Sequence, residues 1–393
     1  MKKKLLIVGR GNEIGGGTEY LITLIKTLHK HFDVDIHMTY GKEEVKNNYE
    51  KHFNYVTFHH VPMVREIKPI SDFNSIKCLY KLMKKEKFDV VHTNSSKGGI
   101  VGRIASKIAK IPFVFHTVHG FSFHEQSSKL SITIFSLLEK IGAKCCDYII
   151  TVSDFHKDWA IKLKIAPQEK IIAIPNGLDP SRVKPSIDRD KIRTSLKIDE
   201  DEIAIFTIGR LAKQKGIEYL LGSLALLEQE KVNNKYHIYI AGSGELEEEL
   251  KNKTVELNIK EKVTFLGHRS DVNNLLSASD IMVLPSLWEG LSIALLEAMA
   301  AKKAIICTDI GSNMTVIEDK KEALVVKSKD SVGLKENIKL LIEDAELRNY
   351  LAEMSNKKFM AEFSKNSMVE RYSNFYKHQA NISEKITYKD AFK

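Results

Sequence analysis

Short apolar runs alternate with longer amphipathic segments along the whole chain. Most of the runs are rich in Val, Ile and Leu without strict apolar–polar alternation, which is typical of strands covered on both faces. This order of elements predicts βαβ units around parallel sheets. The expected strands span residues 4–8, 34–39, 90–92, 112–116, 148–152 and 171–174, and then 203–208, 237–241, 263–266, 281–284 and 304–308.

A cluster of turn-forming residues separates the two series of strands. Residues 174–180 read Ile-Pro-Asn-Gly-Leu-Asp-Pro, and a polar stretch follows before the next strand. A chain of 393 residues is also too long for one ordinary core. We therefore predict two doubly wound, Rossmann-like domains, over residues 1–179 and 180–363. Such domains bind ligands at the carboxyl ends of their strands, so the expected site is a central cleft that both domains face. Residues 364–393 begin with a predicted helix whose packing partner the sequence does not reveal.

The sequence lacks three features that would indicate a membrane, a secreted or a metal-binding protein. No apolar stretch approaches the roughly 20 residues of a membrane span, and the run after Met1-Lys2-Lys3-Lys4 is too short for a signal peptide. The four cysteines are scattered without metal-ligand spacing. We expect a cytoplasmic protein with reduced thiols and no metal site.

Positive charge is concentrated in the first half. Residues 1–175 carry 27 Lys and Arg against 17 Asp and Glu, whereas the remainder carries 33 against 34. Such a surface attracts nucleic acid, anionic lipid or phosphorylated substrates. No motif that interleaves basic and aromatic residues supports nucleic acid, so we expect no nucleic-acid partner.

Two segments of the first half suit a lipid environment. As a helix, residues 75–87 would carry Leu79 and Met83 on one side and Lys77, Lys81 and Lys84 on the other. That pattern indicates either peripheral contact with an anionic membrane or an ordinary solvated helix. Residues 130–141 are rich in Leu, Ile and Phe. They either line a groove for a lipid acceptor or belong to the core.

The first strand leads into a glycine-rich loop that ends in Gly15-Gly16-Gly17 before a predicted helix. Glycines there let backbone N–H groups approach a phosphate at the helix N-terminus. The spacing matches neither the dinucleotide fingerprint nor a P-loop. The loop is either a phosphate site or a flexible turn.

The strand at 203–208 ends in Gly209-Arg210, and Lys215 follows in the same loop. Two cations past the carboxyl end of a strand could converge on a diphosphate, although surface cations are common on loops. The next strand exits contain Gly242-Ser243-Gly244 and His268. Backbone groups at those exits either contact a base or form ordinary turns.

The segment 284–300 contains two glutamates at the start and in the middle of one expected helix. Glu289 precedes the helix and Glu297 lies about two turns into it. One carboxylate could bind a sugar hydroxyl and the other a ribose hydroxyl, or Glu297 could complete a charge pair. An apolar neighbourhood penalises a carboxylate without a polar partner, which favours binding. In the first half, His119 follows a strand and precedes a glycine, a position that favours substrate contact over a core role.

Together these stretches resemble the family-4, group-1 retaining glycosyltransferases with the two-domain GT-B fold. The resemblance covers nearly the whole chain. It rests on the order and spacing of Gly16-Gly17-Thr18-Glu19, Thr117-Val118-His119-Gly120, Pro175-Asn176-Gly177-Leu178-Asp179, Gly209-Arg210, Lys215-Gly216, Phe265-Leu266-Gly267 and Glu289 with Glu297.

The resemblance implies a role for each matching residue. The amides of Gly16 and Gly17 would lie near the donor diphosphate, and Arg210 and Lys215 would neutralise it. Glu289 would hold donor-sugar hydroxyls. Further expected donor contacts come from Gly209, Gly242, Gly244, His268, Gly290, Leu291, the ribose-binding Glu297, and His119 near the reacting carbon. Ser292 stands where many relatives carry proline or phenylalanine, so this loop does not indicate the sugar.

The resemblance also implies the reaction. A hexosyltransferase of this kind moves a sugar from a nucleotide diphosphate donor, here expected to be a UDP-sugar, without a metal cofactor. The departing diphosphate carries the developing negative charge, and fixed cations stabilise it. The acceptor is expected to be a glycan or polyprenyl-linked sugar of bacterial capsular, exopolysaccharide or cell-wall synthesis. A final helix that crosses back onto the N-terminal domain would account for residues 364–380.

Two other enzyme classes are the alternatives. A nucleotide-sugar 2-epimerase shares the fold but needs acid/base carboxylates and lacks the two spaced glutamates. A metal-dependent transferase of the GT-A type needs an Asp-x-Asp after a strand, whereas Asp33-Val34-Asp35 opens one.

Overall fold

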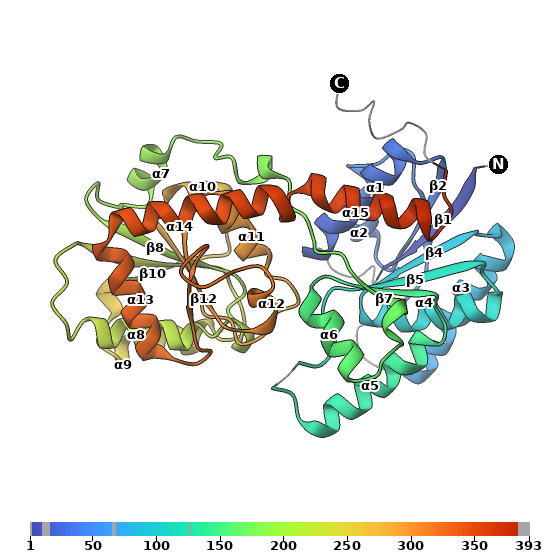
Figure 1. Cartoon of the computed structure of the whole chain (residues 1–393), viewed down its shortest axis with the longest axis horizontal. Coiled ribbons are helices and arrows are strands. Elements are labelled where there is room, and N and C mark those ends of the chain that lie inside the picture. Colours follow the sequence, from blue (N-terminus) through green and yellow to red (C-terminus); the bar gives the residue numbers. More distant parts are fainter. Residues whose placement is uncertain (1, 10–15, 65–67, 125, 384–393) are drawn as a thin grey trace. The chain divides into compact units, whose positions relative to one another are not determined.

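The computed structural model describes residues 2–9, 16–64, 68–124 and 126–383. The chain divides into two compact units (Figure 1). Unit 1 comprises Met1–Asn176 and Asn366–Lys393, and unit 2 comprises Gly177–Lys365. The divisions fall at 176/177 and 365/366, where the sequence predicted 179/180 and 363/364.

Unit 1 is built on a parallel seven-stranded sheet of order β3-β2-β1-β4-β5-β6-β7. Its strands are β1 Lys3–Val8, β2 Val34–Tyr40, β3 Thr57–His60, β4 Val90–Asn94, β5 Phe113–Val118, β6 Tyr148–Thr151 and β7 Ile171–Ala173. Its helices are α1 Gly16–His31, α2 Glu43–Glu50, α3 Pro69–Glu86, α4 Ser96–Ala109, α5 Lys129–Ala143, α6 Asp154–Lys162 and α15 Lys365–His378, with a 3₁₀ turn at Gln168–Lys170.

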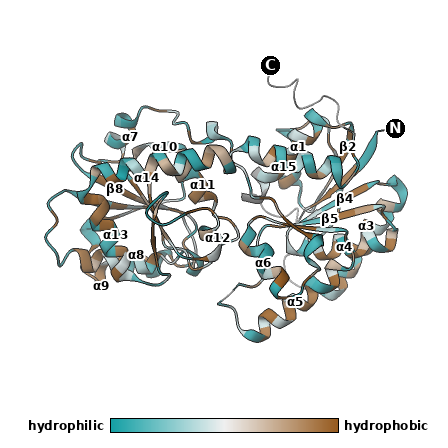
Figure 2. Cartoon of the chain, in the orientation of Figure 1, coloured by the Kyte–Doolittle hydropathy of each residue, from teal (hydrophilic) through white to brown (hydrophobic). Residues whose placement is uncertain are grey.

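Alternate residues of the strands in unit 1 enter two different cores. Leu5 and Ile7 of β1 pack with α1 and α15, whereas Leu6 and Val8 pack with α3 and α4. Successive side chains of a strand point to opposite faces, so a strand between two helical layers has to be apolar at every position. This explains the apolar runs in the sequence, which appear as brown strands in Figure 2.

Unit 2 has a parallel six-stranded sheet of order β10-β9-β8-β11-β12-β13. Its strands are β8 Ile203–Ile208, β9 Tyr236–Ala241, β10 Val263–Gly267, β11 Ile281–Leu284, β12 Ala304–Thr308 and β13 Leu324–Val326. Its helices are α7 Arg189–Ser195, α8 Ile217–Leu227, α9 Glu247–Glu256, α10 Val272–Ala278, α11 Ile293–Ala300, α12 Gly311–Met314, α13 Ser331–Glu343 and α14 Ala345–Lys358, with 3₁₀ turns at Pro180–Val183, Lys213–Lys215 and Lys260–Lys262 and a π-helical turn at Phe359–Phe363.

All the strands expected from the sequence are present, and the described residues contain two further strands that were not expected. β3 is an edge strand whose side chains are at least partly exposed, so its sequence Thr-Phe-His-His carries no apolar run. β13 spans only Leu324–Val326, which is too short to stand out from a loop. An apolar run indicates a strand that is buried on both faces. The edge strand β3 lacks such a run, and β13 is too short to show one.

The final helix of the chain, α15, packs on the sheet of unit 1. Its Tyr372 and Tyr376 are buried with α1 and β5. Tyr20 of α1 donates a hydrogen bond to the Tyr372 hydroxyl at 2.6 Å, and the Tyr376 hydroxyl lies 3.0 Å from Nδ1 of His92 on β4. Helix α15 therefore packs against α1 and the sheet of unit 1.

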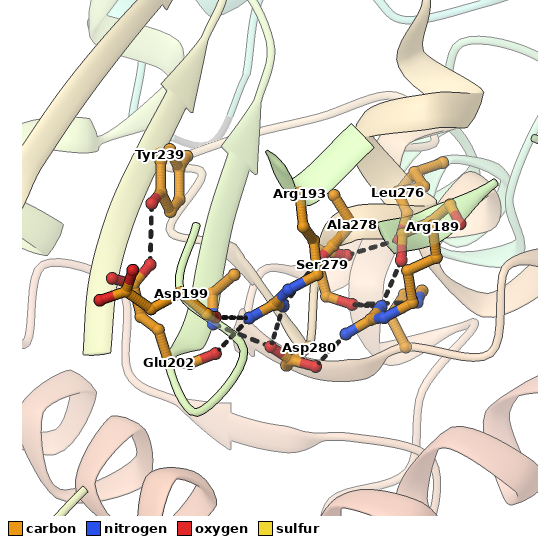
Figure 3. A network of polar contacts seen from close by, with 12 residues as sticks. Arg189, Arg193, Asp199, Glu202, Tyr239, Leu276, Ala278, Ser279 and Asp280 are labelled. Carbon is orange, nitrogen blue, oxygen red and sulfur yellow. Dashed lines mark hydrogen bonds and ion pairs between the residues drawn. The ribbon is translucent and has the colours of Figure 1, made fainter. Parts of the chain in front are cut away.

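A polar cluster ties α7 to the amino edge of the sheet in unit 2 (Figure 3). Asp280, just before β11, accepts from Arg189 at 2.7 Å and from Arg193 at 3.1 Å. It also accepts from the backbone N–H of Ala204 at 2.8 Å. Arg193 further donates to the carbonyls of Asp199 and Glu202. Because these donors are engaged with the protein, we assign the cluster, and the cavity beside it, a structural role.

Candidate active site

The centre of the sheet in unit 2 is a topological switch point. β8 pairs with β11, although β9 and β10 lie between them in sequence. The loops that follow β8 and β11 leave the same carboxyl edge. Ligands of open α/β sheets bind where the strand order reverses. A small cavity at this edge is lined by Thr207, Ile208, Gly209, Lys215, Ile217, Leu284, Pro285 and Ser286.

Lys215 and Glu289 form an ion pair across this switch point. The Lys215 Nζ lies 2.5 Å from Glu289 Oε1, and Ser286 Oγ donates to the same oxygen at 3.1 Å. Gln214 Nε2 donates to Glu289 Oε2 at 3.0 Å. The side chains of Lys215 and Glu289 are 21% and 10% exposed. Both carboxylate oxygens are thus engaged, and one positive charge is fixed at the end of β8.

The two loops that carry this pair are held in direct contact. The N–H of Leu287 donates to the carbonyl of Gln214 at 2.8 Å. Gly216 has a φ of +61°, and a Cβ there would stand 2.2 Å from the carbonyl oxygen of Pro285. Only glycine therefore fits this position. This close approach explains why a glycine directly follows Lys215.

Arg210 takes a different partner from Lys215. Its Nη2 lies 3.0 Å from Glu245 Oε2, and both side chains are more than half exposed. An exposed pair of this kind contributes little to stability, so a stronger anion can displace it. Arg210 and Lys215 share the sheet edge, but each is paired with its own glutamate.

The glycines that follow β8 and β9 have packing roles of their own. A Cβ on Gly242 would stand 1.8 Å from the carbonyl oxygen of Gly209, and one on Gly244 would stand 2.3 Å from that of Leu211. The first two loops of the edge therefore need these glycines whether or not a ligand binds. His268 follows β10 with an exposed side chain.

Glu297 is a buried carboxylate on α11. Its side chain has an ion-pair partner in Arg182, at 3.3 Å from Arg182 Nε to Glu297 Oε1. Arg182 could not be recognised from the sequence because it lies more than a hundred positions from Glu297, in a polar segment without a motif. The charge pair that was the alternative role of Glu297 is thus present, and it supplies the polar partner that burial requires.

Gly290 and Leu291 lie immediately before α11. Ser292 caps this helix by accepting from the N–H of Leu295 at 3.3 Å. Within the described part of the chain, the N–H groups of Gly290 and Leu291 have no hydrogen-bond partner. They remain available to a ligand beside Glu289.

His119 lies in unit 1, directly after β5. Its Nε2 is 3.3 Å from Asn94 Oδ1, and its ring meets the edge of Tyr20 at a centroid distance of 4.6 Å. Desolvation lowers the pKa of His119 to about 4, so the ring is neutral near pH 7. Asn94, at the end of β4, was not singled out from the sequence. Gly16 and Gly17 begin α1, whereas the loop residues 10–15 lie outside the described residues.

We predict that unit 1 loses stability as the pH falls below about 6.5. Burial lowers the pKa of His119 and His156 to about 4 and holds those of His92 and His116 well below the usual value. The unfolded chain therefore takes up protons from pH 6.5 downward that the folded unit rejects. Above pH 6.5 these histidines do not reduce the free energy of unfolding. Below pH 6.5 the free energy of unfolding falls by about 1.4 kcal/mol per pH unit for each such group.

The two tryptophans allow each unit to be followed separately, because Trp159 belongs to unit 1 and Trp288 to unit 2. In the variant Trp288→Phe, the fluorescence-detected melting temperature should drop between pH 7.5 and 5. In Trp159→Phe, which reports on unit 2 with its two histidines, the drop should be smaller. Equal drops would contradict the assignment to the buried histidines.

The described residues contain neither a metal-binding cluster nor a membrane-spanning helix. In residues 2–9, 16–64, 68–124 and 126–383, no group of three or more His, Cys, Asp and Glu side chains is placed to hold a metal ion. Within the same ranges, no helix combines the length and the apolar character needed to cross a bilayer.

Comparison with known proteins identifies the family. Residues 188–358 match the family model of glycosyl transferases group 1, and residues 14–182 match that of glycosyltransferase family 4. The chain is similar to the Escherichia coli UDP-Gal:alpha-D-GlcNAc-diphosphoundecaprenol alpha-1,3-galactosyltransferase, with 33% identity over 80% of this chain and 81% of the relative. It is also similar to the Staphylococcus aureus capsular polysaccharide biosynthesis glycosyltransferase CapM, with 27% identity over 88% and 90%.

Solved structures show the same fold. The structure of Anabaena HepE in complex with UDP superimposes with a TM-score of 0.79 at 20% identity, covering 95% of this chain and 98% of that one. WaaG, a glycosyltransferase involved in lipopolysaccharide biosynthesis, gives 0.72 at 16% identity, with 95% and 99% covered. The predicted family and fold are confirmed: the chain belongs to the family-4, group-1 glycosyltransferases and has the GT-B fold.

Proposed function

We propose that the chain transfers a hexose from a UDP-sugar, with retention of anomeric configuration, to a polyprenyl-diphosphate-linked sugar in bacterial surface polysaccharide synthesis. The observation that carries the donor half of the proposal is the fixed charge of Lys215 at the switch point of unit 2. The UDP in the HepE structure supports a uridine nucleotide.

The donor diphosphate would bind at the carboxyl edge of unit 2. Lys215 would neutralise it, and Arg210 would leave its exposed pair with Glu245 to do the same. The N–H groups of Gly290 and Leu291 would face the donor sugar beside Glu289, and Glu297 would contact the ribose. As the bond to the sugar breaks, charge grows on the diphosphate, where a preorganised cation is most effective.

The proposed retention requires a route that does not use Glu289 as a nucleophile. Lys215, Gln214 and Ser286 already occupy the oxygens of Glu289, so we assign this carboxylate no covalent role. The acceptor hydroxyl would attack the anomeric carbon from the face that the diphosphate leaves, and its proton would pass to the departing phosphate oxygen. If the sugar–diphosphate bond of the donor is axial, the products would be UDP and a sugar joined to the acceptor by an axial bond.

The acceptor half of the proposal rests on the relatives. The Escherichia coli enzyme is named for a diphosphoundecaprenol-linked GlcNAc acceptor. A Campylobacter jejuni relative, 28% identical over 76% of this chain, is named as an N,N'-diacetylbacillosaminyl-diphospho-undecaprenol alpha-1,3-N-acetylgalactosaminyltransferase. A polyprenyl-linked acceptor would place the reaction at the cytoplasmic face of a membrane.

A panel of nucleotides tests the donor. UDP and one of its sugar derivatives should raise the melting temperature of unit 2 by several degrees at about a hundred times their dissociation constants, because they bind only the folded unit. GDP and CDP should have little effect. A shift with GDP alone would refute the uridine assignment.

The same preparations test the reaction. UDP release should require an acceptor, should persist in EDTA, and should yield a product with the donor's anomeric configuration by NMR. Conversion of a UDP-sugar to its epimer without acceptor would instead support the 2-epimerase, and loss of activity in EDTA would refute metal independence.

A further inference from the structure

Helix α5 of unit 1 presents an apolar stripe to solvent. Its outward residues are substantially exposed and recur at helical spacing on one face: Leu130 (69%), Ile134 (49%), Leu137 (57%), Leu138 (36%) and Ile141 (46%). The inward side combines the small buried residues Ser136, Gly142 and Ala143 with Ile132 and Phe135, which pack against the core. The more apolar side of α5 therefore faces outward, the reverse of a water-facing helix (Figure 2).

The stripe continues into a groove between α5 and the segment after α6. The groove has a volume of about 780 Å³. Ile161, Ile165, Ala166 and Pro167 line it from one side, and the end of the α5 stripe lines it from the other. Exposed apolar surface of this extent on one continuous feature marks an interaction site.

Lysines surround the apolar surface. Lys140, Lys144 and Lys164 line the groove, and no acidic residue of the described chain is among its lining residues. Lys170 also lines it, but its ammonium group donates to the carbonyls of Ala143 and Cys146. Glu139, the one acid of α5, lies on the inner side, where it pairs with the buried Arg103 at 2.8 Å. The outward charge of the surface is therefore positive.

We propose that this face of unit 1, the α5 stripe with its lysine-lined groove, seats the protein on an anionic phospholipid bilayer. Leu and Ile side chains would enter the boundary between headgroups and acyl chains, while the lysines would reach the lipid phosphates. The charge of the rim favours lipid over a second copy of the chain, because two such rims would repel each other. The biological reason for this contact rests on the proposed function, in which the acceptor is bound to a membrane. The physical basis of the contact does not depend on that function.

Helix α3, for which the sequence left membrane contact and an ordinary solvated helix as alternatives, is less suitable. Its apolar residues Leu79 and Met83 are buried in the core. Exposed apolar residues of α3 are confined to its first turns, at Ile70 and Phe73. The helix thus offers lysines with little apolar surface to insert.

Flotation with vesicles that contain neither donor nor acceptor tests the apolar stripe. The full chain should bind vesicles of phosphatidylcholine with 30% phosphatidylglycerol, and the variant with Leu130→Ser, Ile134→Ser and Leu137→Ser should bind roughly a hundredfold more weakly. The control carries Val255→Ser and Val332→Ser, two exposed apolar residues of unit 2, and should bind as the wild type does.

The lysines are tested by a matched pair of charge variants. Replacing Lys140, Lys144 and Lys164 by Gln should weaken binding to the anionic vesicles roughly a hundredfold, at about fivefold for each residue. Replacing Lys77, Lys81 and Lys84 of α3, which are also exposed, should weaken it far less. Pure phosphatidylcholine vesicles should bind poorly in every case.

Three results would overturn the proposal: undiminished vesicle binding by the α5 serine variant, an equal loss in the α3 variant, or a dimer in solution that the serine substitutions dissociate. Each variant should retain wild-type turnover with a water-soluble, short-chain acceptor analogue. Because the vesicles lack substrates, a failed transfer assay would count against the proposed function alone, and a failed flotation against the membrane surface alone.

Discussion

The variant Lys215→Ala is expected to transfer sugar about a thousandfold more slowly than the wild type. Lys215 is the cation held at the switch point, by a 2.5 Å pair with Glu289. Removing one preorganised group that stabilises developing negative charge costs about a hundred- to a thousandfold in kcat. A cation that faces a leaving diphosphate belongs at the upper end of this range.

The matched control is Lys213→Ala, two positions earlier in the same 3₁₀ turn. Lys213 is exposed and forms no ion pair within the described residues, so its loss should leave kcat unchanged. Lys215→Arg keeps the charge and should recover part of the activity. Initial rates of UDP release, with melting temperatures for each variant, provide the measurement. If Lys215→Ala retained a tenth of the wild-type kcat, the assignment of the diphosphate site would be wrong.

The variant Asp280→Ala is expected to destabilise unit 2 by about 3–5 kcal/mol, because it leaves the buried Arg193 without its counter-charge. Arg193, only 7% exposed, and Arg189 both converge on this carboxylate. For a unit of this size the loss corresponds to a fall of roughly 6–20 °C in melting temperature. Lys303 adds to the effect: burial and the nearby Arg189 lower its pKa to about 8, while Asp280 opposes that shift.

Trp288 fluorescence in the Trp159→Phe background measures the melting of unit 2. The control Asp201→Ala removes an exposed carboxylate near the same edge, whose one ion-pair partner within the described residues is the exposed Lys235. It should leave the melting temperature unchanged. Asp280→Asn, which keeps the shape and one acceptor oxygen, should fall between the two. A melting temperature of Asp280→Ala equal to that of the control would show that the cluster in Figure 3 does not hold α7 to the sheet.

Several features of the site were predictable because they depend on local sequence. Lys215 and Glu289 were singled out in loops that follow strands, and parallel strands bring such loops to one edge. Glu297 was singled out by its place about two turns into the expected helix that Glu289 precedes. The glycines at 209, 242 and 244 were recognised as strand exits. Their packing against neighbouring carbonyls adds a second reason for their presence.

The partners of the charged residues were not predictable. Gln214 and Ser286 fix Glu289, Glu245 pairs with Arg210, and Arg182 pairs with Glu297. Most of these contacts join residues far apart in the sequence. They depend on the strand order and on loop conformations, which the hydrophobic periodicity of the sequence does not predict.

The two amphipathic helices of unit 1 illustrate the same limit. The sequence showed that residues 75–87 would have a lysine-rich side and that residues 130–141 are rich in Leu, Ile and Phe. It did not show that the apolar side of α3 is buried while the α5 stripe remains exposed. A helix with apolar residues on two sides does not reveal which side the sheet covers.

By itself, the sequence determined the two parallel sheets, the place where they divide, and the strand ends at which chemistry gathers. Burial on both faces and the transition from strand to loop impose those patterns on consecutive residues. Only the tertiary structure decided which side chains meet and which surfaces stay open to water. These depend on how elements distant in the chain pack together, and packing free energy is a property of the assembled neighbours rather than of any one segment.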